Sequence, residues 1–188
     1  MICTDSTDLT RIGTVKSVLL GPGGVGKTTL ALTCLEQRFI PASYTVYMTA
    51  HILTVKADDI EIELQIFDFA GQQQFKAMGL NPGLLQGTQS AALVFDVTEL
   101  DETLDHLPHW IADLPETVPK ILVGNKIDLL PSLDARFDLY EEIRPLMEKY
   151  HFEEFLFTSA KADLRSVNKL FTKLAALALV PHPIPLTP

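Results

Sequence analysis

The sequence predicts an α/β fold in which a mostly parallel sheet of six strands is covered by helices on both faces. Short apolar runs alternate with amphipathic stretches along the 188 residues, which is typical of strands connected by helices. A glycine-rich segment that ends in lysine and threonine follows the first apolar run. The length suits a single domain that buries a core without disulfides or a structural metal.

The predicted strands are short and either apolar or alternating. Asp58 and Asp59 form a polar turn between the second and third strands, which predicts an antiparallel hairpin at one edge of the sheet. Apolar and polar residues alternate along the third strand, so one of its faces should contact water. The six predicted strands cover residues 14–20, 49–57, 60–67, 91–96, 120–124 and 154–157.

About five helices are expected beside these strands. Asp163 is a candidate N-cap for the last helix. Pro145 lies inside the fourth helical pattern and predicts a kink there, or a restart as a second short helix. A turn at 81–83 interrupts the second helix. The first helix carries Leu30, Leu32, Leu35 and Phe39 at helical spacing. The predicted helices cover residues 28–38, 72–86, 104–113, 134–150 and 163–179.

The composition limits the classes of partner that we expect. The formal net charge is −9, and no basic run is present to hold a phosphate backbone, so nucleic acid is not expected as a partner. The two cysteines favour a reducing compartment. We expect residues 1–13 to be an N-terminal extension, 14–179 the domain, and 180–188 a proline-rich tail or linker.

The expected location of the protein is the cytoplasm. Neither a secretory signal nor a membrane-spanning run is evident. The chain has no motif for a direct lipid anchor. Recruitment to a membrane would therefore depend on partners or on further domains beyond this chain.

The glycine-rich segment has the spacing of a phosphate-binding loop. Residues 21–28 fit the pattern G-x-x-x-x-G-K-[ST] between a strand and a helix. The glycines leave backbone N–H groups free to converge on phosphate oxygens. Lys27 can reach the β- and γ-phosphates, and the Thr28 hydroxyl is placed to ligate Mg²⁺. The sequence thus predicts a P-loop NTPase whose nucleotide-binding loop comprises Gly21, Gly23, Gly24, Val25, Gly26, Lys27, Thr28 and Thr29.

An aspartate ends the third strand and a glycine follows it closely. Asp68 can hold the Mg²⁺ shell through water, and Gly71 can offer its N–H to a γ-phosphate. That second contact exists only while the γ-phosphate does. The segment after Asp68 is therefore expected to be ordered by GTP and released on hydrolysis.

Two further motifs select the base. Asn125-Lys126-Ile127-Asp128 follows the fifth strand. The Asp128 carboxylate can accept from the N1–H and 2-amino groups of guanine, a donor pair that adenine lacks, while Asn125 braces the loops and Lys126 lies along the base. After the last strand comes Thr158-Ser159-Ala160-Lys161, where the Ala160 N–H can meet the guanine O6.

These motifs, in this order, resemble the Ras superfamily of small GTPases over residues 14–179. The resemblance implies that Phe39 stacks on the guanine edge, with a core aromatic as the alternative for that residue. It implies that Gln72 orients the attacking water beside Lys27 and Gly71. The implied partners are GTP or GDP, a GTPase-activating protein, an exchange factor and effectors. Residues 144–150 and 182–186 resemble the N-terminal GTPase domain of the Miro family.

The chain departs from the superfamily's pattern in its first switch. The usual Pro-Thr pair, whose threonine completes the Mg²⁺ shell, is replaced by Tyr44-Thr45-Val46. Counting back from Asp68 without gaps places Val46 at that position, so the use of Thr45 requires a shift of one residue. Thr49 is a less favoured substitute because it lies in the predicted second strand. Phe69 stands where a threonine is more usual.

The leading hypothesis is a GTP-binding switch with slow intrinsic hydrolysis and switch regions at about 39–49 and 69–87. Without a convincing internal arginine, turnover is expected on the order of 10⁻⁴ to 10⁻³ per second. The alternative is a guanine-nucleotide-binding scaffold with little or no hydrolysis. A third hypothesis, an enzyme that uses ATP, is disfavoured because Asp128 is expected to select guanine.

Overall fold

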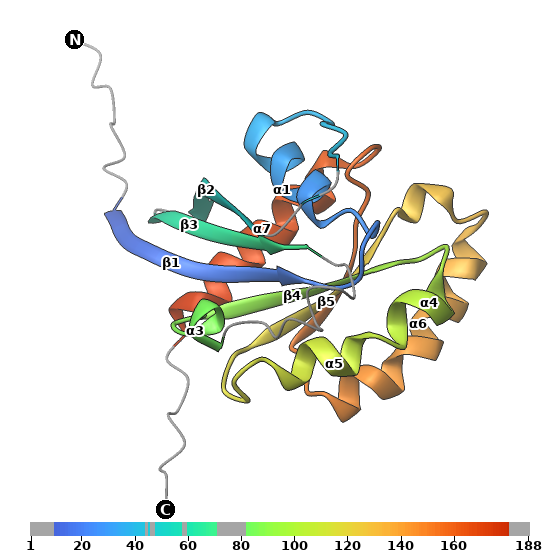
Figure 1. The fold of residues 1–188 in the computed structure, drawn as a ribbon. Coiled ribbons are helices and arrows are strands. Elements are labelled where there is room, and N and C mark those ends of the chain that lie inside the picture. Colours follow the sequence, from blue (N-terminus) through green and yellow to red (C-terminus); the bar gives the residue numbers. More distant parts are fainter. Residues whose placement is uncertain (1–9, 44, 46–47, 58–59, 71–81, 181–188) are drawn as a thin grey trace, which may run out of the picture.

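The computed structural model describes residues 10–43, 45, 48–57, 60–70 and 82–180 (Figure 1). It contains a six-stranded sheet in the order β2-β3-β1-β4-β5-β6. Its strands are β1 (Thr10–Leu20), β2 (Met48–Ala57), β3 (Ile60–Phe69), β4 (Ser90–Asp96), β5 (Lys120–Asn125) and β6 (Glu154–Phe157).

The sheet confirms the predicted mixture of strand directions. β2, at one edge, pairs antiparallel with β3, while β1 pairs parallel with β3 and β4. β4 and β5, and β5 and β6, are also parallel. The predicted turn residues Asp58 and Asp59 lie outside the described residues. In β3, buried Ile62, Leu64 and Ile66 alternate with partly exposed neighbours, and these three side chains pack in the core that includes residues of α1 and α7.

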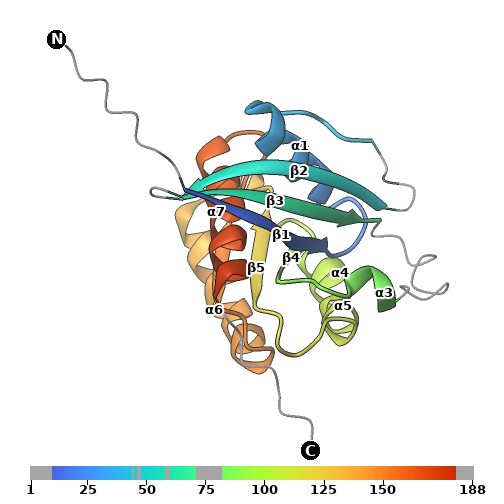
Figure 2. The same cartoon turned by 90° about the vertical axis from the view of Figure 1, so that its left-hand side faces the viewer.

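Helices cover both faces of the sheet. The helices are α1 (Lys27–Glu36), α3 (Pro82–Leu85), α4 (Leu100–Leu104), α5 (Leu107–Ala112), the 3₁₀ turn η1 (Ile127–Leu129), α6 (Leu133–Lys149) and α7 (Leu164–Leu179). Residues of α1 and α7 pack into one apolar core, and residues of α3, α5 and α6 into another. In Figure 2, α7 lies on one side of the sheet, and α3, α4 and α5 lie on the other.

The last helix has the predicted cap. The Asp163 side chain accepts a hydrogen bond of 3.2 Å from the Ser166 N–H, which satisfies one of the free donors at the start of α7. The buried face of α7 includes the predicted Val167, Leu170 and Phe171. This stripe packs in the core beneath the sheet.

Two helix predictions need correction, and a third lies mostly outside the described residues. The predicted helix 104–113 is two short helices, α4 and α5. α6 continues through Pro145 to Lys149, so the predicted restart is wrong. Pro145 is exposed, and water can therefore satisfy the carbonyl that it leaves without a helical donor. Of the predicted helix 72–86, only α3 lies within the described residues.

In α1, only part of the expected apolar face is buried. Leu35 and Phe39 are 45% and 42% exposed, whereas Ala31 and Thr33 are buried beside Leu30. The helix starts at Lys27 and ends at Glu36, so Phe39 lies beyond its end and is not part of its packed face.

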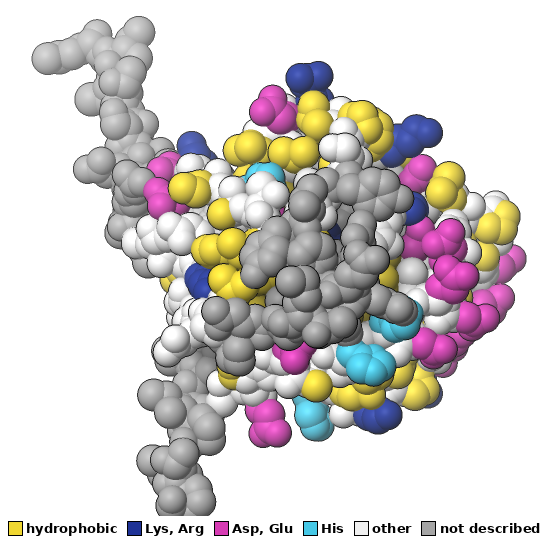
Figure 3. All heavy atoms as spheres, in the orientation of Figure 1, with side chains coloured by type: hydrophobic (Ala, Val, Ile, Leu, Met, Phe, Trp, Pro, Cys, Tyr) yellow, Lys and Arg dark blue, Asp and Glu magenta, His cyan; other side chains and the backbone are white. Residues whose placement is uncertain are grey.

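The visible surface agrees with the acidic composition. Acidic side chains gather at the right-hand edge in Figure 3, over η1 and α6. Exposed Asp134, Asp138, Glu141 and Glu142 belong to this helix. Among the described residues, no helix combines the length and apolar character needed to cross a bilayer.

Candidate nucleotide-binding site

The candidate site lies at the carboxyl ends of the parallel strands. The glycine-rich loop follows β1, Asp68 is the second-to-last residue of β3, and Asn125 ends β5. In an open α/β sheet, this edge is where ligands bind, because the connecting loops leave a crevice there. The register brings these ends level: Leu19 pairs with Asp68, and Asp96 pairs with Asn125.

The glycine-rich loop depends on glycine at two positions. Gly21 has φ 136° and a Cβ there would lie 2.1 Å from the Val94 carbonyl oxygen. Gly26 has φ 96° and a Cβ there would lie 2.5 Å from the Asn125 amide nitrogen. Both residues combine a left-handed backbone with a close neighbour, so no other residue fits without a shift. The loop therefore passes tightly over the strand ends and leads directly into α1.

Lys27 is buried at the start of α1 and faces its own loop. Its ammonium donates to the carbonyl oxygens of Gly21 at 2.9 Å and Pro22 at 2.7 Å. Burial lowers the pKa of Lys27 to about 8, with attraction by Asp68 opposing the shift. An ammonium has three donors, so these two bonds leave one for an anionic ligand in the loop.

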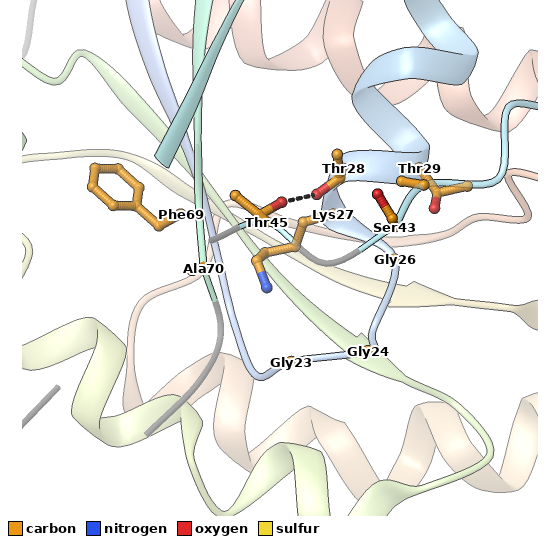
Figure 4. Close-up of a pocket in the computed structure, with 11 residues that line it drawn as sticks. Gly23, Gly24, Gly26, Lys27, Thr28, Thr29, Ser43, Thr45, Phe69 and Ala70 are labelled. Carbon is orange, nitrogen blue, oxygen red and sulfur yellow. Dashed lines mark hydrogen bonds between the residues drawn. The ribbon is translucent and has the colours of Figure 1, made fainter. Parts of the chain in front are cut away.

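Three oxygen-bearing side chains from distant segments converge beside the loop, and two of them, Thr28 and Thr45, are drawn in Figure 4. The Thr28 and Thr45 hydroxyls lie 2.7 Å apart. Thr45 donates to Asp68 Oδ2 at 3.3 Å, and Thr28 also donates to that oxygen. Thr28 is the second residue of α1, Thr45 lies between α1 and β2, and Asp68 belongs to β3. The structure thus brings together the residues predicted to surround Mg²⁺.

The donor chemistry of this cluster fits Mg²⁺. Hydroxyl and carboxylate oxygens are the ligands that this hard cation prefers. Asp68 is 0% exposed, and its Oδ1 has no hydrogen-bond partner among the described residues. Burial raises the pKa of Asp68, while the Thr28 hydrogen bond and the charge of Lys27 oppose that shift. A buried carboxylate oxygen without a donor is well suited to a cation or its bound water.

The segment before β2 places Thr45, and not Thr49, in the cluster. Thr49 pairs with Asp68 in the β2–β3 ladder, but its side chain is exposed. Val46 lies outside the described residues. Thr45 therefore lies in the cluster, while its use as a Mg²⁺ ligand, which requires a shift of one residue from the gapless count, stays a prediction.

Two adjoining pockets lie beside the glycine-rich loop. The first, of about 200 Å³, is lined by the glycine-rich loop, Thr45 and Phe69. The second, of about 270 Å³, is lined by two of the loop glycines and by Thr29, Phe39, Asn125, Lys126, Asp128, Ala160 and Lys161. They share Gly24, Gly26, Thr29 and Ala42. One extended ligand can therefore occupy both pockets.

Asn125 connects the three loops that form the second pocket. It is 2% exposed, and its amide donates to the Val25 carbonyl oxygen at 2.8 Å. Its side-chain oxygen Oδ1 accepts from the Thr158 hydroxyl at 3.0 Å. These contacts join the loops after β1, β5 and β6, which is the bracing that the sequence predicted.

Asp128 is oriented by Ser159. The Ser159 hydroxyl donates to Asp128 Oδ1 at 2.5 Å and accepts from the Ala162 N–H at 2.9 Å. One carboxylate oxygen is thereby held against the loop after β6, and Asp128 remains exposed beside the second pocket.

Some site residues lie outside the described part of the chain, and others were missed. Gly71 and Gln72 fall within 71–81, which the structure does not describe. Ala42 and Ser43 line the first pocket without having been predicted, since nothing in their type marks them. Asp96 was also missed, although its place at the end of a buried strand is the same signal that identified Asp68.

Comparisons with known proteins agree with this geometry. The model of the Ras family matches residues 16–179. The Ras-related protein RIC1 of Oryza sativa subsp. japonica is 35% identical over 170 residues, which cover 85% of this chain and 78% of the relative. The Ras-related protein Rab-1 of Theileria annulata is 34% identical over 167 residues, covering 85% and 72%.

A human relative gives the same result. The Ras-related protein Rab-30 of Homo sapiens is 33% identical over 165 residues, which cover 85% of this chain and 77% of the relative. The family match contains every described residue of the candidate site. The chain therefore belongs to the Ras superfamily of small GTPases.

Proposed function

We propose that this domain is a GTP-binding molecular switch that hydrolyses GTP slowly to GDP and phosphate. The observation that carries the proposal is the contact of Thr45 with both Thr28 and Asp68. Thr45 comes from a connection, whereas Thr28 and Asp68 belong to the rigid helix and strand. A ligand bound at this cluster therefore has direct control over the position of the connection.

The phosphates are assigned to the first pocket. The loop glycines present backbone N–H groups, and the start of α1 adds the positive end of its dipole. Lys27 supplies a fixed cation. Thr28, Thr45 and Asp68 would hold Mg²⁺, which when bound neutralises charge on the phosphate oxygens. The buried position of Asp68 keeps bulk water from competing for its carboxylate.

The base is assigned to the second pocket. Asp128, held by Ser159, accepts from the donor pair of guanine. Lys126 and Phe39 line the same pocket and cover the faces or edge of the base, while Ala160 offers its N–H. Guanine is selected over adenine because only guanine satisfies the Asp128 carboxylate, and an unsatisfied carboxylate in the pocket is costly.

Hydrolysis is assigned to Gln72, with Gly71 binding the γ-phosphate. No arginine occurs among the described residues that line the two pockets. Positive charge for the transition state beyond Lys27 therefore has to come from an activating partner, and the intrinsic rate is on the order of 10⁻⁴ to 10⁻³ per second. An exchange factor and effectors complete the proposed partners, and they supply any recruitment of this cytoplasmic domain to membranes.

The test is single-turnover hydrolysis of bound GTP in the presence of Mg²⁺, for the wild type and for Gln72→Leu. We expect a slow wild-type rate and a further fall in the variant, with GTP binding retained in both. Gln65→Leu, which replaces a partly exposed glutamine of β3 outside both pockets, is the matched control. Retention of GTP without hydrolysis by the wild type would support a nucleotide-binding scaffold instead. Equal affinity for ATP and GTP would contradict the assignment of Asp128.

A further inference from the structure

A buried carboxylate lies behind the second pocket and has no role in the proposed function. Asp96 is the last residue of β4, and its side chain is 1% exposed. Its Oδ2 forms an ion pair with the Lys126 ammonium. Its Oδ1 accepts from the Thr98 backbone N–H at 3.0 Å and from the Thr98 hydroxyl at 2.8 Å. Thr98 therefore fixes the carboxylate so that one oxygen remains for Lys126.

The sheet and the turn after β5 create this pairing. Asp96 is level with Asn125 in the β4–β5 ladder, and the Val97 N–H donates to the Asn125 carbonyl oxygen at 3.1 Å. Lys126 follows directly and has φ 66°, in the left-handed region that non-glycine residues rarely adopt. The charge pair thus joins the ends of two neighbouring strands at a turn with an unusual backbone.

The two partners differ in their access to the ligand. Lys126 lines the second pocket with Phe39 and Asp128, whereas Asp96 is not part of the pocket wall. The Lys126 side chain is 35% exposed. The Asp96 carboxylate therefore reaches the pocket wall through its ion pair with Lys126.

We propose that Asp96 is a positioning residue that prolongs the lifetime of bound guanine nucleotide by holding Lys126 in the pocket wall. The inference rests on the proposed function of this pocket. A lysine side chain has many rotamers, and ordering it when the ligand binds costs entropy. Asp96 imposes that order before the nucleotide arrives, so binding loses less free energy.

The substitution Asp96→Asn separates this role from the rest of the local structure. An asparagine oxygen still accepts from Thr98, and the bonds between the Asp96 backbone and the Thr103 hydroxyl do not involve the carboxylate. The variant loses the charge that attracts Lys126 and turns amide N–H donors, in place of an acceptor, toward the Lys126 ammonium.

The experiment measures dissociation of a fluorescent GDP analogue, with Mg²⁺ present, from wild type, Asp96→Asn, Lys126→Met and the double variant. We expect Asp96→Asn to release GDP about tenfold faster, as for the loss of one charge-assisted contact. In the Lys126→Met background, the same substitution should change the rate less than about twofold, because a residue that acts through Lys126 has no independent effect. Glu154→Gln, which removes a carboxylate paired with Lys169 and Lys173, is the matched control and should release GDP at the wild-type rate.

Two results would overturn the inference. One is an unchanged rate in Asp96→Asn; the other is an equal acceleration with and without Lys126, which would indicate a purely structural role. If Asp96→Asn does not fold, Thr98→Ala at an exposed position serves instead, with an expected acceleration of about threefold that disappears in Lys126→Met. No acceleration in Thr98→Ala would then count against the inference. Failure of the wild type to retain GDP would contradict the proposed function itself.

Discussion

The hydroxyls of Thr28 and Thr45 lie 2.7 Å apart, although Thr28 is the second residue of α1 and Thr45 lies in the connection to β2. Both hydroxyls also donate to the same oxygen of Asp68. A connection of this kind has few backbone partners, so its position depends strongly on such side-chain contacts. Thr45 is therefore the residue through which the bound nucleotide would control the first switch.

Replacement of Thr45 by alanine should weaken the GTP complex more than the GDP complex. The variant lacks the hydroxyl that would complete the Mg²⁺ shell, and we expect roughly tenfold weaker Mg²⁺ binding with a GTP analogue, equivalent to about 1.4 kcal/mol. Titration of Mg²⁺ against a fluorescent analogue measures this change. Thr45→Ser should restore the affinity, and Ser43→Ala, in the same pocket, should leave it unchanged. Equal weakening of the GDP and GTP complexes would contradict a switch role for Thr45.

The glycine-rich loop allows a matched pair of substitutions. Gly26→Ala and Gly24→Ala both place a Cβ on a left-handed residue, with φ of 96° and 80°, which costs roughly 1–2 kcal/mol. Only at Gly26 does the new Cβ meet a neighbour, the Asn125 amide nitrogen at 2.5 Å. Gly26→Ala should therefore lose more stability than Gly24→Ala and should also release nucleotide faster.

Urea denaturation of the nucleotide-free proteins and GDP dissociation measure these two effects. Gly13→Ala is the control, because a Cβ there has nothing within 4 Å and Gly13 is not at positive φ. Equal stability of the two loop variants would show that Asn125 moves aside freely, contrary to its buried bonds with Val25 and Thr158.

Much of the fold follows from local patterns. Six strands and the edge hairpin were predicted because the period of apolar residues and the turn at 58–59 depend only on neighbouring residues. The cap at Asp163 is equally local. The division between α4 and α5, the passage of α6 through Pro145 and the exposure of Leu35 depend on what packs against each helix. Such tertiary contacts have no signature in a short window of sequence.

The residues of the candidate site also differ in whether local sequence or tertiary contacts determine them. The loop glycines, Asp68 and Asp128 were predicted from motifs with fixed spacing. Thr45 was ambiguous, because the connection before β2 has no periodic pattern to fix its register. Asp96 carried the local signal of an aspartate at the end of a buried strand, but its pairing with Lys126, which follows β5, depends on the β4–β5 register and has no signature in the sequence around Asp96.

Cys34 should be an unreactive thiol below strongly alkaline pH. Burial raises the pKa of Cys34 from an ordinary value of 9.0 to about 11. The thiolate is the reactive form, so at pH 8 its alkylation in the folded protein should be about a hundredfold slower than that of an unperturbed cysteine. The rate should rise about tenfold for each unit of pH until it levels near pH 11.

Iodoacetamide labelling of a Cys3→Ser variant measures this rate, because the chain has only two cysteines. The urea-unfolded variant is the control and should level near pH 9. The folded state favours the neutral Cys34 thiol. The contribution of this thiol to the free energy of unfolding is therefore fully present below pH 9 and is lost as the pH rises toward 11. Cys34→Ala should lack this loss between pH 9 and 11. A folded-state midpoint near pH 9 would mean that water reaches the Cys34 thiol between α1 and α7, and that the contact of its Sγ with Asn168 does not persist in solution.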